Sequence, residues 1–298
     1  MTRRRGEIRI GTSGWRYRGW RGDFYPSGLR QRDELGYLAQ RVNSLELNGS
    51  FYSLQRPDSF RSWAQDTPDD FVFAVKGGRF ITHLRQLVDV EVALANHCAS
   101  GVLALGPALG PTLWQLPARM AFDGERMASF LDLLPRTAGE VAELAVRHDD
   151  KVPEGRALTQ LAAGVDPMTP VRHALEPRHE SFADVRAREL LSRHGIALVE
   201  SDSAGTWPRF AAVTGDFVYV RLHGETQLYS GGYSDSSLDG WADRVRAWSD
   251  QGLDVYVYFD NDATGRAPYD AVALLERLGV ERGRRLRETR GGDQDGSS

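Results

Sequence analysis

The chain has 298 residues, of which 41% are hydrophobic and 26% charged, the range of a globular protein that can bury one large core. A net charge of −4 removes the simplest argument for nucleic-acid binding, a globally basic surface, although a local basic patch stays open. Cys98 is the single cysteine, which excludes an internal disulfide and a zinc site built from several thiolates, so we interpret it as a core residue.

Two kinds of apolar segment are missing from the sequence. No run approaches the roughly 18 residues of a membrane span. The arginines near the N-terminus are not followed by the apolar stretch of a secretory signal. We therefore expect a cytoplasmic protein with no membrane partner.

Eight short β-rich segments recur along the chain and predict eight strands. They cover residues 7–14, 44–52, 71–77, 111–117, 171–179, 196–203, 217–224 and 254–262. Helical periodicity falls between them, at 32–42, 89–105, 124–135, 187–195 and 240–252. This alternation is typical of a parallel sheet, and eight strands favour a closed (β/α)8 barrel of the TIM type. An open doubly wound sheet is the alternative, but no G-x-G-x-x-G turn follows the first strand.

One segment interrupts this spacing before the fifth strand. Residues 137–168 are longer than an ordinary connection, so we predict a helical insertion within a single domain that spans residues 1–280. The piece AELAVRHD inside the insertion can also be interpreted as a strand. Residues 281–298 become arginine-rich and then rich in Gly, Asp and Ser, which predicts a frayed tail.

Charged side chains recur near the ends of the predicted strands, where parallel strands are normally apolar on both faces. They are Glu46 with Asn48, Lys76, Glu176 with Arg178, Glu200 with Asp202, and Arg221 with His223. Residues two apart point to the same face of a strand, so each pair projects to one side. In a barrel we expect the pairs to converge at the C-terminal mouth, where enzymes of this fold carry their reacting groups. The alternative is a buried ion network that only ties the strands together.

Two loops at the same end carry aromatic side chains. In the stretch GTSGWRYRGWRGDFYP (11–26), Trp15 and Tyr17 are candidates for a wall that stacks on a flat ligand such as a sugar ring or nucleobase, or alternatively for a hydrophobic plug. After the seventh strand, Tyr229 and Tyr233 flank a Gly-Gly pair where barrels often bind phosphate. The alternative there is a flexible surface loop.

Seven motifs resemble those of the domain-of-unknown-function-72 family, also called YecE-like: GTSGWRYRGW, ELNGSFY, KGGRFITH, GPTLWQLP, EPRHES, YVRLHG and YFDND. The resemblance covers about residues 7–279 and implies a TIM barrel. It implies a shared pocket, without assigning roles, for Glu46, Asn48, Tyr52, Lys76, His83, Gln115, Glu176, Arg178, His179, Asp202, Arg221, His223 and Asn261. The chain departs from the family at Phe182, where tryptophan is usual, at Asp260, where asparagine is usual, and in the 137–168 insertion. The family is similar in barrel type to endonuclease IV and xylose isomerase relatives, an analogy that suggests nucleic-acid or sugar substrates.

The leading hypothesis is an enzyme that performs acid/base chemistry on an anionic substrate, phosphorylated or of nucleotide or sugar type. The candidates for proton transfer are Glu46 and Glu176 as bases, and His179 and His223 as acids. The candidates for substrate binding are Trp15, Tyr17, Asn48, Tyr52, Lys76, His83, Gln115, Arg178, Asp202, Arg221, Tyr229, Tyr233 and Asn261. Carboxylates beside fixed cations have depressed pKa values, so the working base should be the one least paired.

Three alternatives stay open. A metal-dependent hydrolase or isomerase would use Glu46, Glu176, Asp202 and a histidine as ligands, but no H-E-x-x-H motif is present and no metal or cofactor is assigned. A retaining glycosidase would need Glu46 and Glu176 about 5 to 5.5 Å apart. A non-catalytic nucleic-acid binder would use the aromatic loop with its basic residues, Arg16, Arg18, Arg21 and Arg30, and its affinity would fall steeply with salt.

Overall fold

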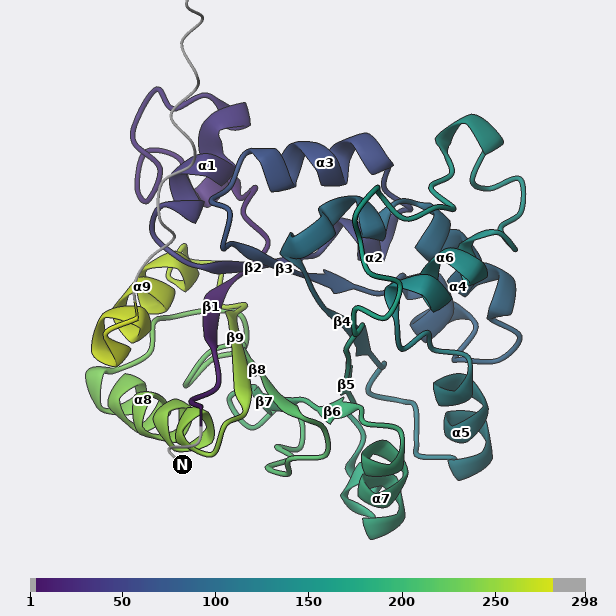
Figure 1. Ribbon diagram of the computed structural model, residues 1–298. Helices are drawn as coiled ribbons and strands as arrows, with labels where there is room; N and C mark the ends of the chain where they lie inside the picture. The colour runs from purple at the N-terminus through teal and green to yellow at the C-terminus, as the bar shows by residue number, and fades with distance from the viewer. Residues whose placement is uncertain (1–3, 281–298) are drawn as a thin grey trace, which may run out of the picture.

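The predicted alternation of strands and helices produces a parallel barrel in the computed structural model, which describes residues 4–280 (Figure 1). Seven of the predicted strands form as single strands: β1 (Ile8–Ser13), β2 (Ser44–Leu47), β3 (Val72–Lys76), β4 (Leu109–Gln115), β5 (His173–Glu176), β8 (Phe217–Leu222) and β9 (Asp254–Phe259). The predicted tail, 281–298, lies outside the described residues.

The sixth predicted strand is divided at Val199 into β6 (Ala197–Leu198) and β7 (Glu200–Asp202). The hydrogen-bonded order is β6-β5-β4-β3-β2-β1-β9-β8-β7, and every pair is parallel. Because β6 and β7 are the two halves of the sixth predicted strand, the sheet nearly closes into a barrel. The prediction of a TIM-type barrel is therefore confirmed.

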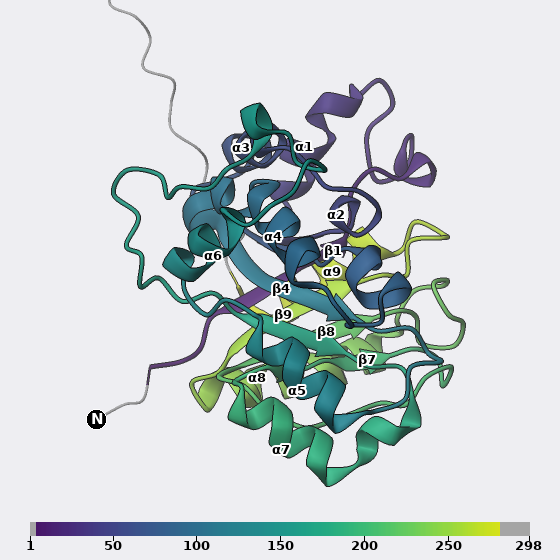
Figure 2. The same ribbon diagram turned by 90° about the vertical axis from the view of Figure 1, so that its right-hand side faces the viewer.

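Helices surround the barrel when it is viewed roughly along its axis (Figure 1), and Figure 2 shows α5 and α7 on its outer face. The longer ones are α1 (Glu34–Ala39), α3 (Pro57–Gln65), α4 (Glu91–Ala99), α5 (Gly124–Asp132), α7 (Val185–Arg193), α8 (Asp235–Asp250) and α9 (Ala267–Leu278). Helices α3 and α9 were not predicted, and each has a proline in its first turn. Helix α8 begins earlier than predicted because Ser234 caps it by accepting the N–H of Ser237.

The 137–168 segment begins with helix α6 (Ala138–Ala145), capped by Thr137, which accepts the N–H of Glu140. The rest of the segment contains turns and a short 3-10 helix (Glu154–Arg156). The strand interpretation of AELAVRHD is wrong, because its first four residues end α6 and the rest form a turn and irregular backbone. Cys98 is buried on α4, where burial raises the pKa of its thiol to about 12, as expected for a core residue.

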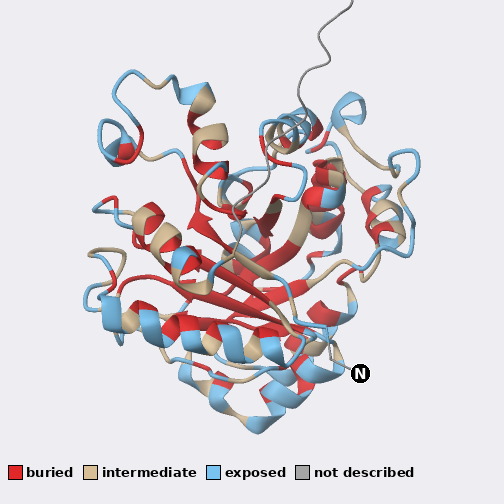
Figure 3. Cartoon of the chain, turned by 60° about the vertical axis from the view of Figure 1, so that its left-hand side comes forward, coloured by how far each residue is buried: buried red, intermediate tan, exposed pale blue. Residues whose placement is uncertain are grey.

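The interior of the barrel is filled by alternate residues of the strands, and Figure 3 shows that the strands are buried while the helices expose their outer faces. The interior cluster pairs small with large side chains: Ala74, Leu113, Ala174, Ala197, Val199, Phe217, Tyr219, Tyr256 and Tyr258. Gly11 lets β1 and β2 approach closely, because a Cβ there would lie 1.8 Å from the Ser44 carbonyl oxygen. Among residues 4–280, no helix is both long and apolar enough to cross a bilayer.

Candidate functional site

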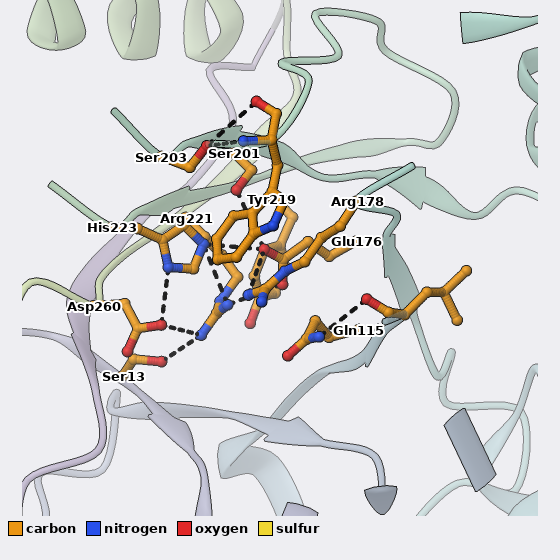
Figure 4. Close-up of polar contacts among 12 residues, drawn as sticks. Ser13, Gln115, Glu176, Arg178, Ser201, Ser203, Tyr219, Arg221, His223 and Asp260 are labelled. Atoms are coloured by element: carbon orange, nitrogen blue, oxygen red, sulfur yellow. Dashed lines mark hydrogen bonds and ion pairs between the residues drawn. The ribbon is translucent and has the colours of Figure 1, made fainter. Parts of the chain in front are cut away.

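The C-terminal end of the barrel interior is polar. Two residues beyond the apolar layer, the next inward side chains of the strands and strand ends are Ser13, Glu46, Lys76, Gln115, Glu176, Ser201, Arg221 and Asp260. Alternation along each strand explains this arrangement, since residues two apart share a face. Figure 4 shows most of these side chains pointing toward one another across the barrel.

Arg221 lies at the centre of this layer and is fully buried. Its Nη2 donates to Glu46 Oε1 at 2.8 Å and to Asp260 Oδ2 at 2.9 Å, and its Nη1 donates to Glu176 Oε2 at 2.9 Å. Its Nη2 also donates to Ser13 Oγ at 2.8 Å. One guanidinium thus binds side chains from β1, β2 and β5 and from the end of β9. We call Arg221 and these four partners, Ser13, Glu46, Glu176 and Asp260, the Arg221 cluster.

Two carboxylates of the Arg221 cluster, those of Glu176 and Asp260, stay ionised despite their burial. Desolvation opposes ionisation, but the Arg221 and Arg178 guanidiniums hold the pKa of Glu176 well below its usual range. For Asp260, Arg221 and His223 overcome the effect of burial and lower the pKa to about 2. The cluster therefore has the form of the buried ion network that the sequence analysis kept as an alternative.

His223 is held between two of these carboxylates. Its Nε2 lies 3.0 Å from Glu176 Oε1, and its Nδ1 lies 3.0 Å from Asp260 Oδ2. Tyr229 packs edge-on against the imidazole, with ring centroids 5.5 Å apart, and has a left-handed backbone with φ of 60°. A left-handed tyrosine is strained and persists only where its surroundings fix it, so this loop is tightly held over His223.

Two further cations, Lys76 and Arg178, border the cluster. The ammonium of Lys76 makes no hydrogen bond or ion pair with any described residue and lies 4.5 Å from the ring centroid of Phe51. Burial, together with the charge of Arg221, lowers the pKa of Lys76 to about 8. The guanidinium of Arg178 lies 3.6 Å from the ring centroid of Trp207, donates to Glu176 at 3.4 Å, and leaves its buried Nε without a partner.

His83 and Gln115 lie on the β3–β4 side of the mouth. His83 Nδ1 is 2.9 Å from the Thr82 hydroxyl, and His83 Nε2 is 3.4 Å from Gln115 Nε2. Burial and the nearby Lys76 lower the pKa of His83 to about 4. His83 is therefore neutral at neutral pH.

Four of the predicted binding residues lie around the cluster without contacting Arg221. Tyr17 donates its hydroxyl to the Ser13 carbonyl at 2.5 Å, and Asn48 Nδ2 donates to Ser13 Oγ at 3.1 Å. Trp15 is buried against Trp63 with ring centroids 5.6 Å apart, whereas the side chain of Tyr52 is 69% exposed. The contacts of Trp15 are those of the plug alternative.

Three other predicted residues hold local structure away from Arg221. Tyr233 is buried against Phe259 and interacts with Asp202. Asn261 donates from Nδ2 to the Gly231 carbonyl at 2.7 Å. The side chain of His179 caps the 3-10 helix Glu180–Ala183. Binding roles for Asp202, Tyr233 and Asn261, and a proton-transfer role for His179, stay predictions.

The expectation that Glu200 converges with the other strand-end charges is wrong. Glu200 faces the helix layer, where it accepts from Arg209 at 2.7 Å and pairs with Arg244 of α8. In β7 the residue that faces the barrel interior is Ser201, whose hydroxyl donates to Glu176 at 3.2 Å. The two-residue period is right for the sixth strand, but the charged residue Glu200 lies on its outer face.

Sequence reasoning missed several members of the site: Ser13, Ser201, Trp207, Tyr219 and Asp260. Asp260 carried a signal, because it lies two residues beyond the inward-facing Tyr258. Trp207 carried none, because it lies in an irregular loop five residues after β7, where strand periodicity no longer applies. Phe182, where the family resemblance leads one to expect tryptophan, is buried against Phe122 with ring centroids 5.4 Å apart.

The alternatives to proton transfer fit this geometry poorly. Of the carboxylates proposed as metal ligands, Glu46 and Glu176 converge on the Arg221 guanidinium, whereas Asp202 interacts with Tyr233. Residues 4–280 contain no group of three or more His, Cys, Asp or Glu side chains arranged to hold a metal ion. In a retaining glycosidase the two carboxylates lie on either side of the glycosidic bond of the substrate. Here the Arg221 guanidinium occupies the space between Glu46 and Glu176.

Of the arginines proposed to bind nucleic acid, Arg21 pairs with Glu34 at 2.6 Å and Arg30 with Asp33 at 2.7 Å. Nucleic-acid binding stays a prediction.

The chain is similar to proteins whose family description names no activity. A family profile described as "Protein of unknown function DUF72" matches residues 9–293. The UPF0759 protein YunF of Bacillus subtilis (strain 168) is 23% identical over 309 residues, which cover 92% of this chain and 95% of that protein. The UPF0759 protein YecE of Escherichia coli (strain K12) is 26% identical over 193 residues, or 61% of this chain and 66% of that protein.

Solved structures support the same relationship. The crystal structure of a DUF72 family protein from Thermotoga maritima has a TM-score of 0.69 at 25% identity, covering 92% of this chain and 99% of that one. A DUF72 family protein from Enterococcus faecalis has a TM-score of 0.63 at 15% identity, over 93% of this chain and 99% of that one. The second likeness supports the fold alone.

Proposed function

The chain belongs to the family described as "Protein of unknown function DUF72", and from that premise we propose that it is an enzyme that removes a proton from a small anionic substrate at the C-terminal mouth of its barrel. The observation that carries the proposal is the ammonium of Lys76. It is buried beside the Arg221 cluster and makes no hydrogen bond or ion pair with any described residue. The proposal assigns the role of general base to its neutral amine.

The use of lysine at this position supports a role in proton transfer. The chain contains 37 lysines and arginines, and only two of them, Lys76 and Lys151, are lysines. Arginine stays protonated at any ordinary pH, whereas a buried lysine can lose its proton. With a pKa of about 8, roughly a tenth of the Lys76 side chains are neutral at pH 7.

The four residues first predicted for proton transfer are weaker candidates. Glu46, Glu176 and His223 are fully buried and each contacts a charged partner. A carboxylate with a strongly depressed pKa is a poor base, so we propose that Glu176 positions Arg178 and His223 instead. Nδ1 of His179 lies 2.9 Å from the Ser181 hydroxyl.

The substrate is proposed to be anionic because of the cations that face the mouth. The Arg178 guanidinium is flat against Trp207 and only partly engaged by Glu176, so its free N–H groups suit a carboxylate or phosphate. Arg221, in contrast, has its donors occupied by protein carboxylates. Arg178 is therefore the proposed clamp, and Arg221 is the fixed charge beneath it.

Replacement of Lys76 by arginine, which keeps the charge but not the titration, tests the proposal. We expect Lys76→Arg to lower kcat/KM at least about a hundredfold, the contribution typical of a positioned general base. The assay screens phosphate esters, sugar acids and nucleotides for conversion by NMR. Arg126→Met, on the outer surface of α5, is the matched control and should change kcat/KM less than twofold. Turnover by Lys76→Arg within threefold of wild type, or no conversion of any compound, contradicts the proposal.

The pH dependence of kcat/KM gives a second prediction. Because the base must be deprotonated, kcat/KM of the wild-type protein should rise with pH and level off above about 8, the pKa of Lys76. This parameter reports the free enzyme, so an anion bound beside the ammonium does not shift it. A profile that falls through this range, or a rising limb that survives in Lys76→Arg, argues against Lys76 as the base.

A further inference from the structure

A cavity of about 310 Å³ lies beside the mouth, outside the Arg221 cluster. Its walls come from the short helix α2 (Gly49–Tyr52), the π-helical turn Phe80–Leu84 and α4. Its lining comprises Ser50, Phe51, Tyr52, Ser53, Leu54, Gly78, Arg79, Phe80, Ile81, Leu84, Ala93, Asn96, His97 and Lys151. The volume is at the lower end of the roughly 300 to 1,000 Å³ typical of small-molecule sites.

Several apolar residues that line the cavity are exposed to solvent. Tyr52 is 69% exposed, Leu84 64%, Phe80 46% and Leu54 39%. They account for four of the ten large hydrophobic side chains that are exposed in the described part of the chain. Scattered exposed apolar residues are ordinary, but a contiguous group around a hollow is typical of a binding site.

The charges around the cavity are positive, although the protein as a whole carries −4. None of the described lining residues is acidic, whereas Arg79 and Lys151 are basic. Arg79 forms no ion pair with a described residue, and its guanidinium lies 6.0 Å from the ring centroid of Tyr52. Lys151 lies 5.5 Å from the ring centroid of Phe80 and pairs at 3.5 Å with Asp149, which is outside the lining. A negative group on a ligand would therefore meet an unpaired arginine.

A buried histidine lies between this cavity and a smaller one beside Trp114 and His173. His97 lines the cavity, its residue is 5% exposed, and its Nε2 has no hydrogen-bond partner. Burial lowers the pKa of His97 to about 4, so its imidazole is neutral at pH 7 and can donate or accept one hydrogen bond.

The cavity and the mouth share one aromatic ring. Phe51 lines the cavity, and its ring centroid lies 4.5 Å from Lys76 Nζ and 5.1 Å from the His83 ring. A molecule whose ring occupies the cavity would thus lie next to the proposed base.

We propose that this cavity binds the flat apolar part of an aromatic anion, with the acidic group of that ligand beside Arg79. Exposed aromatic and aliphatic walls stabilise the ring, while the absence of acidic lining residues favours the negative charge. The inference deepens the proposed function by naming aromatic carboxylates or phosphates as the class of substrate, and it rests on that function in this respect alone. Binding itself requires no turnover.

Fluorescence titration with 8-anilinonaphthalene-1-sulfonate, an aromatic anion, tests the cavity directly. We expect saturable binding with one site per chain, competition by 2-naphthoate, and at least tenfold weaker competition by the neutral 2-naphthol or by inorganic phosphate. Leu84→Asp should weaken binding at least tenfold, and Arg79→Glu at least threefold. Val213→Asp, at an apolar side chain that is 48% exposed and outside the cavity, is the matched control and should change binding less than twofold.

Thermal melts keep the test interpretable, since the dye also binds partly unfolded protein. Arg79 is exposed and forms no ion pair within residues 4–280, so Arg79→Glu serves as the second variant if Leu84→Asp lowers Tm. Non-saturable binding, or equal affinity in wild type and Arg79→Glu, overturns the inference. It is also overturned if sedimentation shows a dimer that Leu84→Asp dissociates, because the cavity is then covered by a second copy. Failure here leaves the Lys76→Arg result untouched, so the two proposals fail separately.

Discussion

Arg221→Met is expected to destabilise the folded protein by at least about 4 kcal/mol, because it leaves several buried carboxylates without their shared cation. Glu46 and Glu176 are fully buried and both bind this guanidinium, as does the largely buried Asp260. Breaking one buried pair typically costs about 3 to 5 kcal/mol, and here three are broken together. Urea denaturation at pH 7.5 measures the loss in the free energy of unfolding.

A matched surface variant separates this effect from the loss of any arginine. Arg246 pairs with Asp243 at 3.0 Å but is 46% exposed, so Arg246→Met should cost less than about 1 kcal/mol. If Arg221→Met does not fold, Arg221→Lys retains one charge and should show an intermediate loss. A cost for Arg221→Met as small as that for Arg246→Met would show that the cluster contributes little to stability.

The loss in the free energy of unfolding of Arg221→Met relative to wild type should also depend on pH. Without the guanidinium, burial raises the pKa of the orphaned carboxyl groups above their unfolded values. The folded variant then binds more protons than the unfolded chain, so its stability relative to wild type should improve as the pH falls from 8 toward 5. A deficit that is constant over this range contradicts the assignment of the penalty to unpaired carboxylates.

Lys76→Met is expected to increase the free energy of unfolding at pH 7 by about 3 kcal/mol while it removes the proposed base. The pKa of Lys76 is lowered from 10.5 to about 8 in the folded state, so the unfolded chain binds its proton more tightly. The wild-type protein therefore carries the full penalty below pH 8 and loses it as the pH rises toward 10.5. Methionine, which fills the space without a charge, carries no such penalty.

The difference between the two proteins is the quantity to measure. Urea denaturation from pH 7 to 10 should show the stability advantage of Lys76→Met shrinking as the pH rises. Lys151→Met, at a side chain that is 63% exposed, should follow the wild-type curve. If Lys76→Met is less stable than wild type at pH 7, the ammonium is a stabilising partner of the cluster and not a strained base. Stability that is sacrificed at one residue is typical of active sites.

Hydrophobic and polar periodicity was enough to predict the barrel and most of the polar layer. Glu46, Glu176 and Arg221 were found because each is a charge at the end of an otherwise apolar strand. The same logic put Glu200 in the mouth, since a sequence does not distinguish the face that lines a barrel from the face that meets a helix. The contacts of Glu200 with Arg209 and with Arg244 of α8 show the difference.

Features that depend on loops could not be predicted in this way. Trp207 and Arg178 are far apart in sequence, and their stacking follows from the path of the chain after β7. The cavity beside the mouth depends on the π-helical turn Phe80–Leu84, for which no sequence pattern was available. The aromatic residues of 11–26 were recognised, but the packing of Trp15 against Trp63 could not be predicted from their spacing.

The position of Arg221 late in the chain has a consequence for biosynthesis. Glu46 emerges from the ribosome 175 residues before its cation, and Glu176 emerges 45 residues before it. Until β8 has been translated, these acids have no Arg221 to neutralise them, and a prematurely collapsed interior would have to enclose bare negative charge. We therefore expect the interior of the barrel to close only after β8 has been made, about three quarters of the way along the chain.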